Sequence, residues 1–115
     1  MSFDLINNVY DFENSEQGMN FLNKSLGELF PEFKLVKSFH NDNYHGYGVE
    51  YEFNSIKIKI GCERSALTHL ISISSDQLTL YKFDKNMKKV LAFSRKNILY
   101  TLTLLRKVLK EKSQL

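Results

Sequence analysis

The chain of 115 residues has no tryptophan, one cysteine, one proline and five glycines. A lone Cys62 cannot form an internal disulfide, which fits a protein of the reducing cytoplasm. No stretch approaches the ~20 consecutive apolar residues of a membrane-spanning helix. The first residues also lack the basic and apolar regions of a secretory signal. We therefore predict a cytoplasmic protein that does not contact a membrane.

Catalytic fingerprints are missing as well. The sequence has no P-loop, no dinucleotide-binding glycine motif, no G-x-S-x-G and no EF-hand loop. One cysteine also excludes the paired cysteines of a structural zinc site. These absences favour a binding protein over an enzyme, and we expect neither a cofactor nor a bound metal.

What is present is the composition of one globular domain. Apolar residues make up 43% of the chain and aromatic residues 13%, which is enough for a buried core at this length. The formal charge of +3 hides a gradient. Residues 1–32 carry six acids and one base, residues 33–84 six of each, and residues 85–115 one acid and nine bases. Such a gradient either places oppositely charged segments side by side or leaves a basic patch for an acidic partner.

Two segments have the pattern of amphipathic helices. The first covers residues 15–29, with Asn14 as its cap, Gln17 in the capping-box position and Pro31 just past its end. The second follows Ser94 as its cap and carries basic residues opposite an apolar stripe. Its stripe consists of Ile98, Leu102, Leu105 and Leu109. The pattern of residues 3–12 fits a helix or a strand equally well.

The clearest strand signal is a hairpin from Glu50 to Lys59. Apolar and charged residues alternate on both sides of Asn54-Ser55, so that folding the chain there places Glu50 opposite Lys59. The same register places every apolar side chain on one face and every charge on the other. The turn lacks the glycine that two-residue turns prefer, and a four-residue loop would keep the register.

The same alternation extends the sheet in both directions. A turn at Ser65-Ala66 places Cys62 opposite His69, and a turn near Ser75-Asp76 brings Leu78 and Leu80 to the apolar face. Residues 33–39 fit a first strand, residues 40–48 a loop, and residues 90–93 a short last strand or an early helix start. We predict one α+β domain over residues 1–115. It is an antiparallel β-meander of five or six strands, with the N- and C-terminal helices packed on one face.

The loop at residues 40–48 is the most distinctive candidate site. His40, Asp42 and His45 could bind a divalent ion, or the two histidines could act as acid and base in phosphodiester cleavage. Neither chemistry has its specific residue spacing here. Tyr44 and Tyr47 lie among Asn and His, a composition typical of protein-binding loops. We prefer this last interpretation.

Two other groups of residues invite a chemical interpretation. Cys62 and His69 resemble a nucleophile and base pair, but both fall on the predicted core face, where a buried thiol is usually inert. A basic cluster in the C-terminal third could contact phosphates, although no RNP, KH or helix-turn-helix signature accompanies it. Its members are Lys85, Lys88, Lys89, Arg95, Lys96, Arg106, Lys107 and Lys110.

The whole chain resembles the small single-domain immunity proteins that bacteria make against contact-dependent and polymorphic toxins. The resemblance rests on architecture: a short α+β chain, no catalytic motif, and an aromatic polar loop beside a charged sheet edge. It implies an inhibitor that binds a cognate toxin, such as a nuclease domain, and blocks its active site. Many such proteins are acidic against basic nucleases, and the net charge of +3 departs from that pattern. The acidic residues of the first third could still supply such a surface: Asp11, Glu13, Glu16, Glu28 and Glu32.

We predict that the toxin contacts the polar loop and the charged face of the sheet. The protein is expected to be a monomer in the complex, and a homodimer is possible because the apolar stripe of the last helix is broad. The alternatives are a nucleic-acid binder that uses the basic C-terminal third and, less favoured, a nuclease that depends on His40 and His45. The predicted contact residues are Asp42, Asn43, Tyr44, His45, Tyr47, Glu50, Glu52, Lys57, Lys59 and Tyr81.

Overall fold

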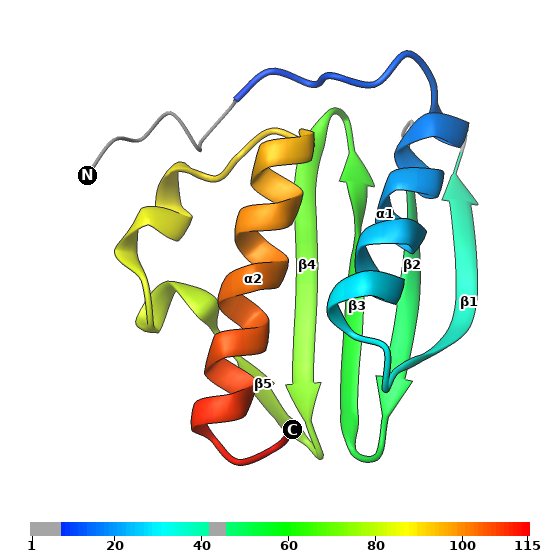
Figure 1. Cartoon of the computed structure of the whole chain (residues 1–115). Coiled ribbons are helices and arrows are strands. Elements are labelled where there is room, and N and C mark those ends of the chain that lie inside the picture. The colour runs from blue at the N-terminus through cyan, green and yellow to red at the C-terminus, as the bar shows by residue number, and fades with distance from the viewer. Residues whose placement is uncertain (1–7, 42–45) are drawn as a thin grey trace.

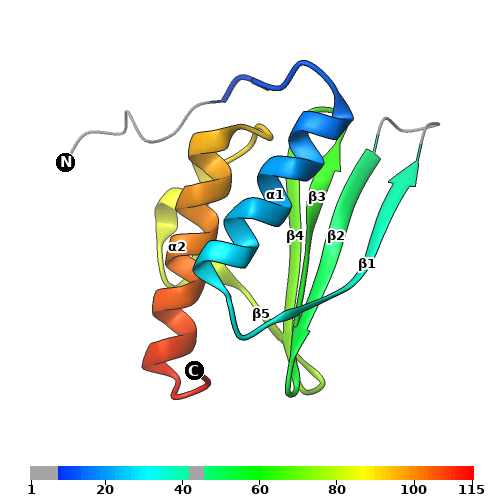
Figure 2. The ribbon, with the colours of Figure 1, turned by 45° about the vertical axis from the view of Figure 1, so that its right-hand side comes forward.

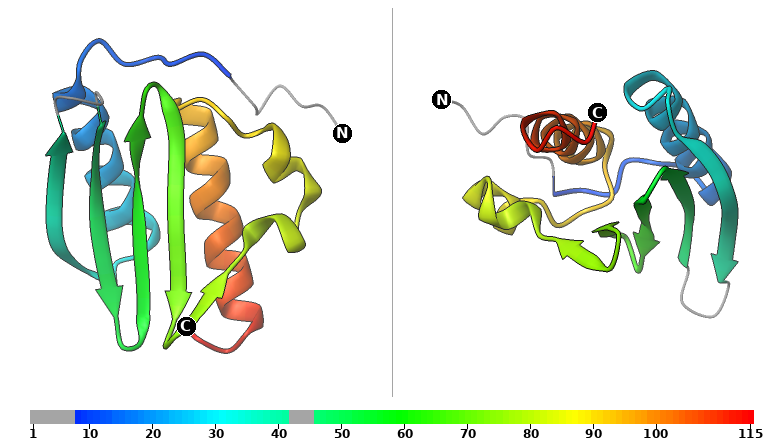
Figure 3. Two further views of the ribbon diagram at one scale, coloured as in Figure 1. Left: turned by 180° about the vertical axis from the view of Figure 1, so that it is seen from behind. Right: turned by 90° about the horizontal axis from the view of Figure 1, so that it is seen from below.

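The computed structural model describes residues 8–41 and 46–115 and shows a sheet with two helices on one side (Figure 1). The five strands are antiparallel and lie in chain order, from β1 at one edge to β5 at the other. Both helices cover the same face, as the rotated views show (Figures 2 and 3). The predicted α+β meander is confirmed, with five strands. The elements are α1 (Ser15–Leu29), β1 (Lys34–Asn41), β2 (Gly46–Phe53), β3 (Ile56–Glu63), β4 (Ala66–Ile73), β5 (Asp76–Leu78) and α2 (Arg95–Glu111).

The helices begin where the sequence predicts. The Asn14 side chain accepts a hydrogen bond from the Gln17 amide at 2.9 Å, and the Gln17 side chain accepts one from the Glu13 amide at 3.0 Å. The Ser94 hydroxyl accepts one from the Asn97 amide at 3.2 Å. Each cap satisfies a backbone donor that the first helical turn leaves without a partner. The capping residues therefore fix how both helices enter the layer above the sheet.

The core fills the space between the helices and the inner face of the sheet. The inner face is the apolar face that the hairpin predicts, and α1 and α2 each contribute a stripe that is wholly inaccessible to solvent. The most deeply buried residues from the two layers include Leu22, Leu26, Val49, Ile56, Ile58, Ile60, Ile71, Ile98, Leu102, Leu105 and Leu109. Within the described residues, no helix is both long and apolar enough to cross a membrane.

The central hairpin has the predicted register. Glu50 lies opposite Lys59 and Glu52 opposite Lys57. The turn has only two residues, and Asn54 adopts the left-handed conformation with φ of 54°. Asparagine tolerates this conformation better than most residues do, so the turn closes without a glycine.

The next two turns come one residue earlier than predicted. The β3–β4 turn is Arg64–Ser65, and both residues have positive φ, at 51° and 68°, as the favoured two-residue hairpin turn requires. Cys62 therefore lies opposite Leu67, and the predicted pairing of Cys62 with His69 is wrong. The turn after β4 shifts in the same way. Because each register moves by two residues, the side chains of β4 and β5 keep their predicted faces.

The chain leaves the sheet after Leu78. The prediction that Leu80 and Tyr81 continue the strand is wrong, because Leu80–Lys82 and Lys85–Lys89 form two 3₁₀ helices, η2 and η3. Leu80 is nevertheless buried. The predicted strand at residues 90–93 is reduced to one bridge between Ala66 and Ala92.

The predicted loop at residues 40–48 also proves shorter. Strand β1 continues to Asn41 and β2 begins at Gly46, so both flanks of the loop belong to the sheet. At the N-terminus, residues 8–12 form neither helix nor strand. The earlier part of the segment predicted as helix or strand lies outside the described residues.

The charge gradient along the chain is partly used inside the fold. Arg106 donates two hydrogen bonds of 2.9 Å to the Glu32 carboxylate, and Arg95 lies 3.5 Å from Asp11. These pairs join the acidic first third to the basic last helix. The arrangement of oppositely charged segments side by side is therefore observed at these two places.

Candidate functional site: the open face of the sheet

The face of the sheet opposite the helices is open (Figure 3, left). No described helix covers it, and its charged side chains stand in two rows that run across β1, β2 and β3. In each row the sign alternates, with a carboxylate on β2 between an ammonium on β1 and another on β3. The rows are Lys37–Glu50–Lys59 and Lys34–Glu52–Lys57.

A bulge in β1 makes this alignment possible. The register between β1 and β2 shifts between Leu35 and Lys37, so that Val36 is the extra residue. Without it, the alternation of side chains would send Lys34 and Lys37 to opposite faces. The bulge therefore brings both lysines to the open face.

In a third row, next to the charged ones, the two central residues are glycines. Phe39 of β1 is followed across the sheet by Gly48, Gly61 and then Thr68. A Cβ on Gly48 would lie 2.4 Å from Cζ of Phe39 and 2.6 Å from the carbonyl oxygen of Ile60. A Cβ on Gly61 would lie 2.3 Å from the carbonyl oxygen of Tyr47. The backbones come too close here for any larger residue.

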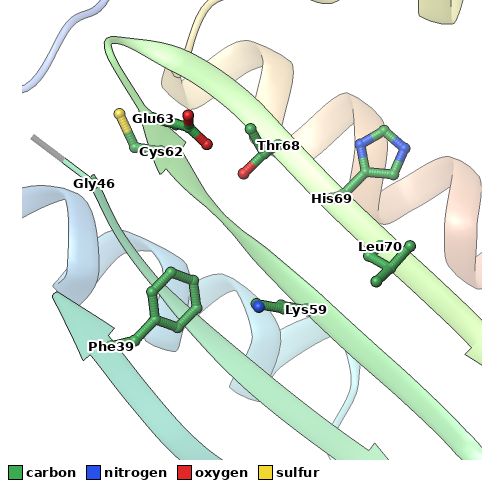
Figure 4. A pocket seen from close by; sticks show the side chains of 8 residues that line it. All are labelled: Phe39, Gly46, Lys59, Cys62, Glu63, Thr68, His69 and Leu70. Atoms are coloured by element: carbon green, nitrogen blue, oxygen red, sulfur yellow. The ribbon is translucent and has the colours of Figure 1, made fainter. Parts of the chain in front are cut away.

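A groove of about 480 Å³ adjoins this row. Figure 4 shows the side chains around it, with Phe39 on one side and Leu70 on the other. Leu70 is 51% exposed, and Nζ of Lys59 lies 5.1 Å from the centre of the Phe39 ring. The groove also has Glu63 and Thr68 in its wall. An apolar centre with charges on one side is thus presented to solvent.

The four charged residues predicted on this face are found there. Glu50 and Glu52 are half-buried, and Lys57 and Lys59 are exposed. Among the described residues, none of these charges closes to an ion pair; salt bridges within 4 Å are Arg95–Asp11 and Arg106–Glu32. The row charges therefore stay accessible to a partner.

Tyr47 was predicted as a contact residue, and its burial contradicts this. It is only 3% exposed, because its position in β2 directs it to the inner face beneath α1. Its hydroxyl lies 2.9 Å from that of Tyr10, and α1 comes so close that a Cβ on Gly18 would lie 2.2 Å from the Tyr47 oxygen. Burial raises the pKa of Tyr47 well above its ordinary value. Tyr47 belongs to the core.

Tyr81 was predicted on the open face and is not there. It lies in η2, beyond the end of β5, with Nζ of Lys88 4.7 Å from its ring centre. The other predicted loop contacts, Asp42, Asn43, Tyr44 and His45, lie outside the described residues.

The geometry gives little support to a reactive Cys62–His69 pair or to a metal site. Cys62 and His69 are not opposite each other, and burial raises the pKa of the Cys62 thiol and lowers that of His69. A protonated, buried thiol is a poor nucleophile. In the part of the chain that the structure describes, no group of three or more His, Cys, Asp or Glu residues is placed to hold a metal ion.

The basic C-terminal third is also less available than its sequence indicates. Arg95 and Arg106 hold acidic side chains of the first third, and the Arg95 guanidinium lies 4.4 Å from the centre of the Phe12 ring. A groove of about 550 Å³ does run along the outer side of α2, past Leu99, which is 42% exposed. The broad apolar stripe predicted for this helix therefore reaches the surface.

Phe39, Leu70 and the two facing glycines were missed as site residues. The signal for Phe39 was its spacing of two residues from Lys37, which places both on one strand face. Gly48 was hidden because a glycine near a polar stretch usually indicates a loop.

Searches of protein-family models, curated proteins and solved structures find nothing that matches this chain.

Proposed function

We propose that this protein is an inhibitor of the immunity type, which binds a cognate toxin through the open face of its sheet and covers the toxin's active site. The observation that carries the proposal is the groove between Phe39 and Leu70, an exposed apolar centre beside ordered charges on an uncovered sheet. Exposed apolar patches with a polar rim are typical of protein-interaction sites.

The composition of the face suits protein recognition. Interfaces commonly have an apolar, well-packed centre with a polar rim, and here Leu70 and Phe39 supply the centre and the rows of lysine and glutamate the rim. Charges arranged in a fixed pattern select the partner and its orientation more than they add affinity. Such a face supports a binder of one specific protein.

The proposed role in inhibition needs only a rigid surface. The open face is formed by β1 to β4, which pair along most of their length, and the backbones of β2 and β3 are in close contact where Gly48 faces Gly61. A preformed surface loses little conformational entropy on binding. Tight binding across a toxin's active site would follow without any chemistry by the inhibitor.

The test is co-expression with the protein encoded by the neighbouring reading frame, followed by purification of the complex and a growth assay. Leu70→Glu places a charge in the groove and is expected to abolish both complex formation and protection. Leu99→Glu is the matched control, because Leu99 is similarly exposed but lies on the outer side of α2. Circular dichroism melts of both variants check that they fold.

The results distinguish the open face from α2 as the binding surface. Loss of the complex in Leu70→Glu with retention in Leu99→Glu supports the open face as the binding surface. Loss in Leu99→Glu alone moves the interface to α2 and overturns the proposed surface. If the wild-type protein forms no complex and gives no protection, the inhibitor function itself is wrong.

A further inference from the structure

Strand β1 is the long free edge of the sheet. It has eight residues and pairs only with β2, whereas the other edge strand, β5, has three. Leu35 and Val36 on β1 are each 48% exposed. A strand at the edge of a sheet presents backbone donors and acceptors to any chain that can pair with it.

The register tells which backbone groups of β1 point outward. The two-residue turn makes Phe53 and Ile56 the hydrogen-bonded pair that closes the central hairpin. Hydrogen-bonded and non-bonded pairs alternate along antiparallel strands, so Gly48 and Glu50 direct their backbone groups toward β1. Their partners on β1 are Phe39 and Lys37.

Ser38, between those two partners, therefore directs its N–H and C=O away from β2. The same alternation predicts that Leu67 on β4 points away from β3, and its amide does bond to the Leu91 carbonyl at 2.8 Å, outside the β3–β4 ladder. Within the described residues, the Ser38 backbone makes no hydrogen bond outside the ladder. Its outward groups are available for a further strand.

Charge decides which strand fits there. Both charged rows end on β1 with an ammonium, after alternating plus, minus, plus from β3 outward: Lys37 ends one row and Lys34 the other. A carboxylate at the next position of each row, beyond β1, would continue the alternation of charge. The sequence of β1, KLVKSFHN, contains no acid, so that a second copy of β1 would supply no carboxylate to either row.

We propose that β1 binds an extended acidic segment of the partner protein as a sixth strand, whose carboxylates extend the rows beyond Lys34 and Lys37. The segment would bond to the backbone of Ser38 and lie beside the open face, where Lys37 and Phe39 belong to both surfaces. Addition of a strand gains affinity from the main chain and specificity from alternate side chains. This inference uses the proposed function only in taking the partner to be a protein.

The probe is a synthetic peptide, Thr-Glu-Val-Glu-Val-Thr, with blocked ends, titrated into the whole protein labelled with ¹⁵N. The expected result is that backbone amides of β1, Ser38 foremost, shift with added peptide. The control peptide Thr-Gln-Val-Gln-Val-Thr is expected to bind about two- to thirtyfold more weakly, because two cross-strand charge pairs are lost. Equal affinity for both peptides would overturn the role of charge.

Two variants test the edge itself. Ser38→Pro removes one outward N–H, and proline is tolerated on an edge strand where that group faces solvent; binding should be lost, while Ser38→Ala should bind like the wild type. If Ser38→Pro fails to fold, the double variant Lys34→Gln/Lys37→Gln replaces it, and it should no longer distinguish the two peptides. Unchanged binding by folded Ser38→Pro would refute strand addition at β1.

Two further results have a clear meaning. A dimer in sedimentation that Ser38→Pro dissociates would show that a second copy occupies the edge, against the proposal. If the toxin complex of the proposed function forms but survives Ser38→Pro unchanged, strand addition is wrong and the inhibitor function stands. If no toxin complex forms although the peptide binds β1, the inhibitor function is wrong and strand addition at β1 stands.

Discussion

Replacing Gly48 by alanine tests the close approach of β2 and β3 beside the groove. The added Cβ would lie 2.4 Å from Cζ of Phe39, 2.6 Å from the carbonyl oxygen of Ile60 and 2.8 Å from Cα of Gly61. The phenyl ring can rotate away, but the two backbone atoms belong to the paired strand β3 and cannot. Overpacking of this kind costs about 1–3 kcal/mol.

A second effect of the substitution acts on stability in the opposite direction. Alanine restricts the unfolded chain more than glycine does, and at a permissive site this stabilises a protein by about 0.4–1 kcal/mol. Because two of the three close contacts are with backbone atoms, the overpacking at Gly48 should cost about 2–3 kcal/mol, and a net loss of about 1–2.6 kcal/mol should remain. Gly27→Ala is the matched control, because an added Cβ there meets nothing within 4 Å. That substitution should stabilise the protein by up to about 1 kcal/mol.

Urea denaturation followed by circular dichroism measures both changes, with the slope m expected to stay constant. Adding Phe39→Ala to Gly48→Ala should restore only a minor part of the loss, since it relieves one of the three contacts. The reasoning is refuted if Gly48→Ala is as stable as the wild type or more stable. In that case β2 and β3 can separate at this point, and the sheet beside the groove is not rigid.

The remaining predictions concern α1 and the link between the two ends of the chain. Gly18→Ala should destabilise the protein by about 1–3 kcal/mol, because the new Cβ would lie 2.2 Å from the Tyr47 hydroxyl oxygen. Adding Tyr47→Phe should recover part of that loss, as measured in urea melts. If it recovers nothing, the clash is elsewhere. The hydrogen bonds from Arg106 lower the pKa of Glu32 from 4.5 to about 2. The stabilisation by Glu32 is therefore complete above its unfolded pKa and is lost as pH falls toward 2. Wild type and Glu32→Gln should differ by about 1 kcal/mol or less near neutral pH, given solvent screening, and should converge in acid; a constant difference would contradict the assigned pairing.

The sequence predicted the faces of the sheet better than its turns. Side-chain parity depends on a strict alternation, so one clear hairpin determined which face each later strand would bury. The turn at Arg64–Ser65 was missed by one residue. Both residues adopt a positive φ there, but neither Arg nor Ser is a residue type that indicates such a conformation in a sequence. Shifts of two residues in register cannot be detected from parity, since they leave the faces unchanged.

The candidate site was predicted only where charge marked it. Glu50, Glu52, Lys57 and Lys59 alternate with apolar neighbours and could be assigned to the open face directly. Tyr47 could not be assigned, because it lies at the start of β2, between two glycines that resemble a loop. The end of β5 was equally hidden: Leu78 and Leu80 are spaced like strand residues, yet the chain turns into η2 between them, and both are still buried.

The two edges of the sheet differ in a way that bears on both proposals. Strand β5 has three residues, and the chain continues from it into η2 and η3, so that edge is too short to recruit a strand. Strand β1 is long, and its lysines and the bulge at Val36 are devices that discourage pairing between identical edges. They do not discourage pairing with an acidic strand, because each lysine that repels its own copy attracts a carboxylate. The features that keep this protein from joining itself are therefore the ones that would select its partner.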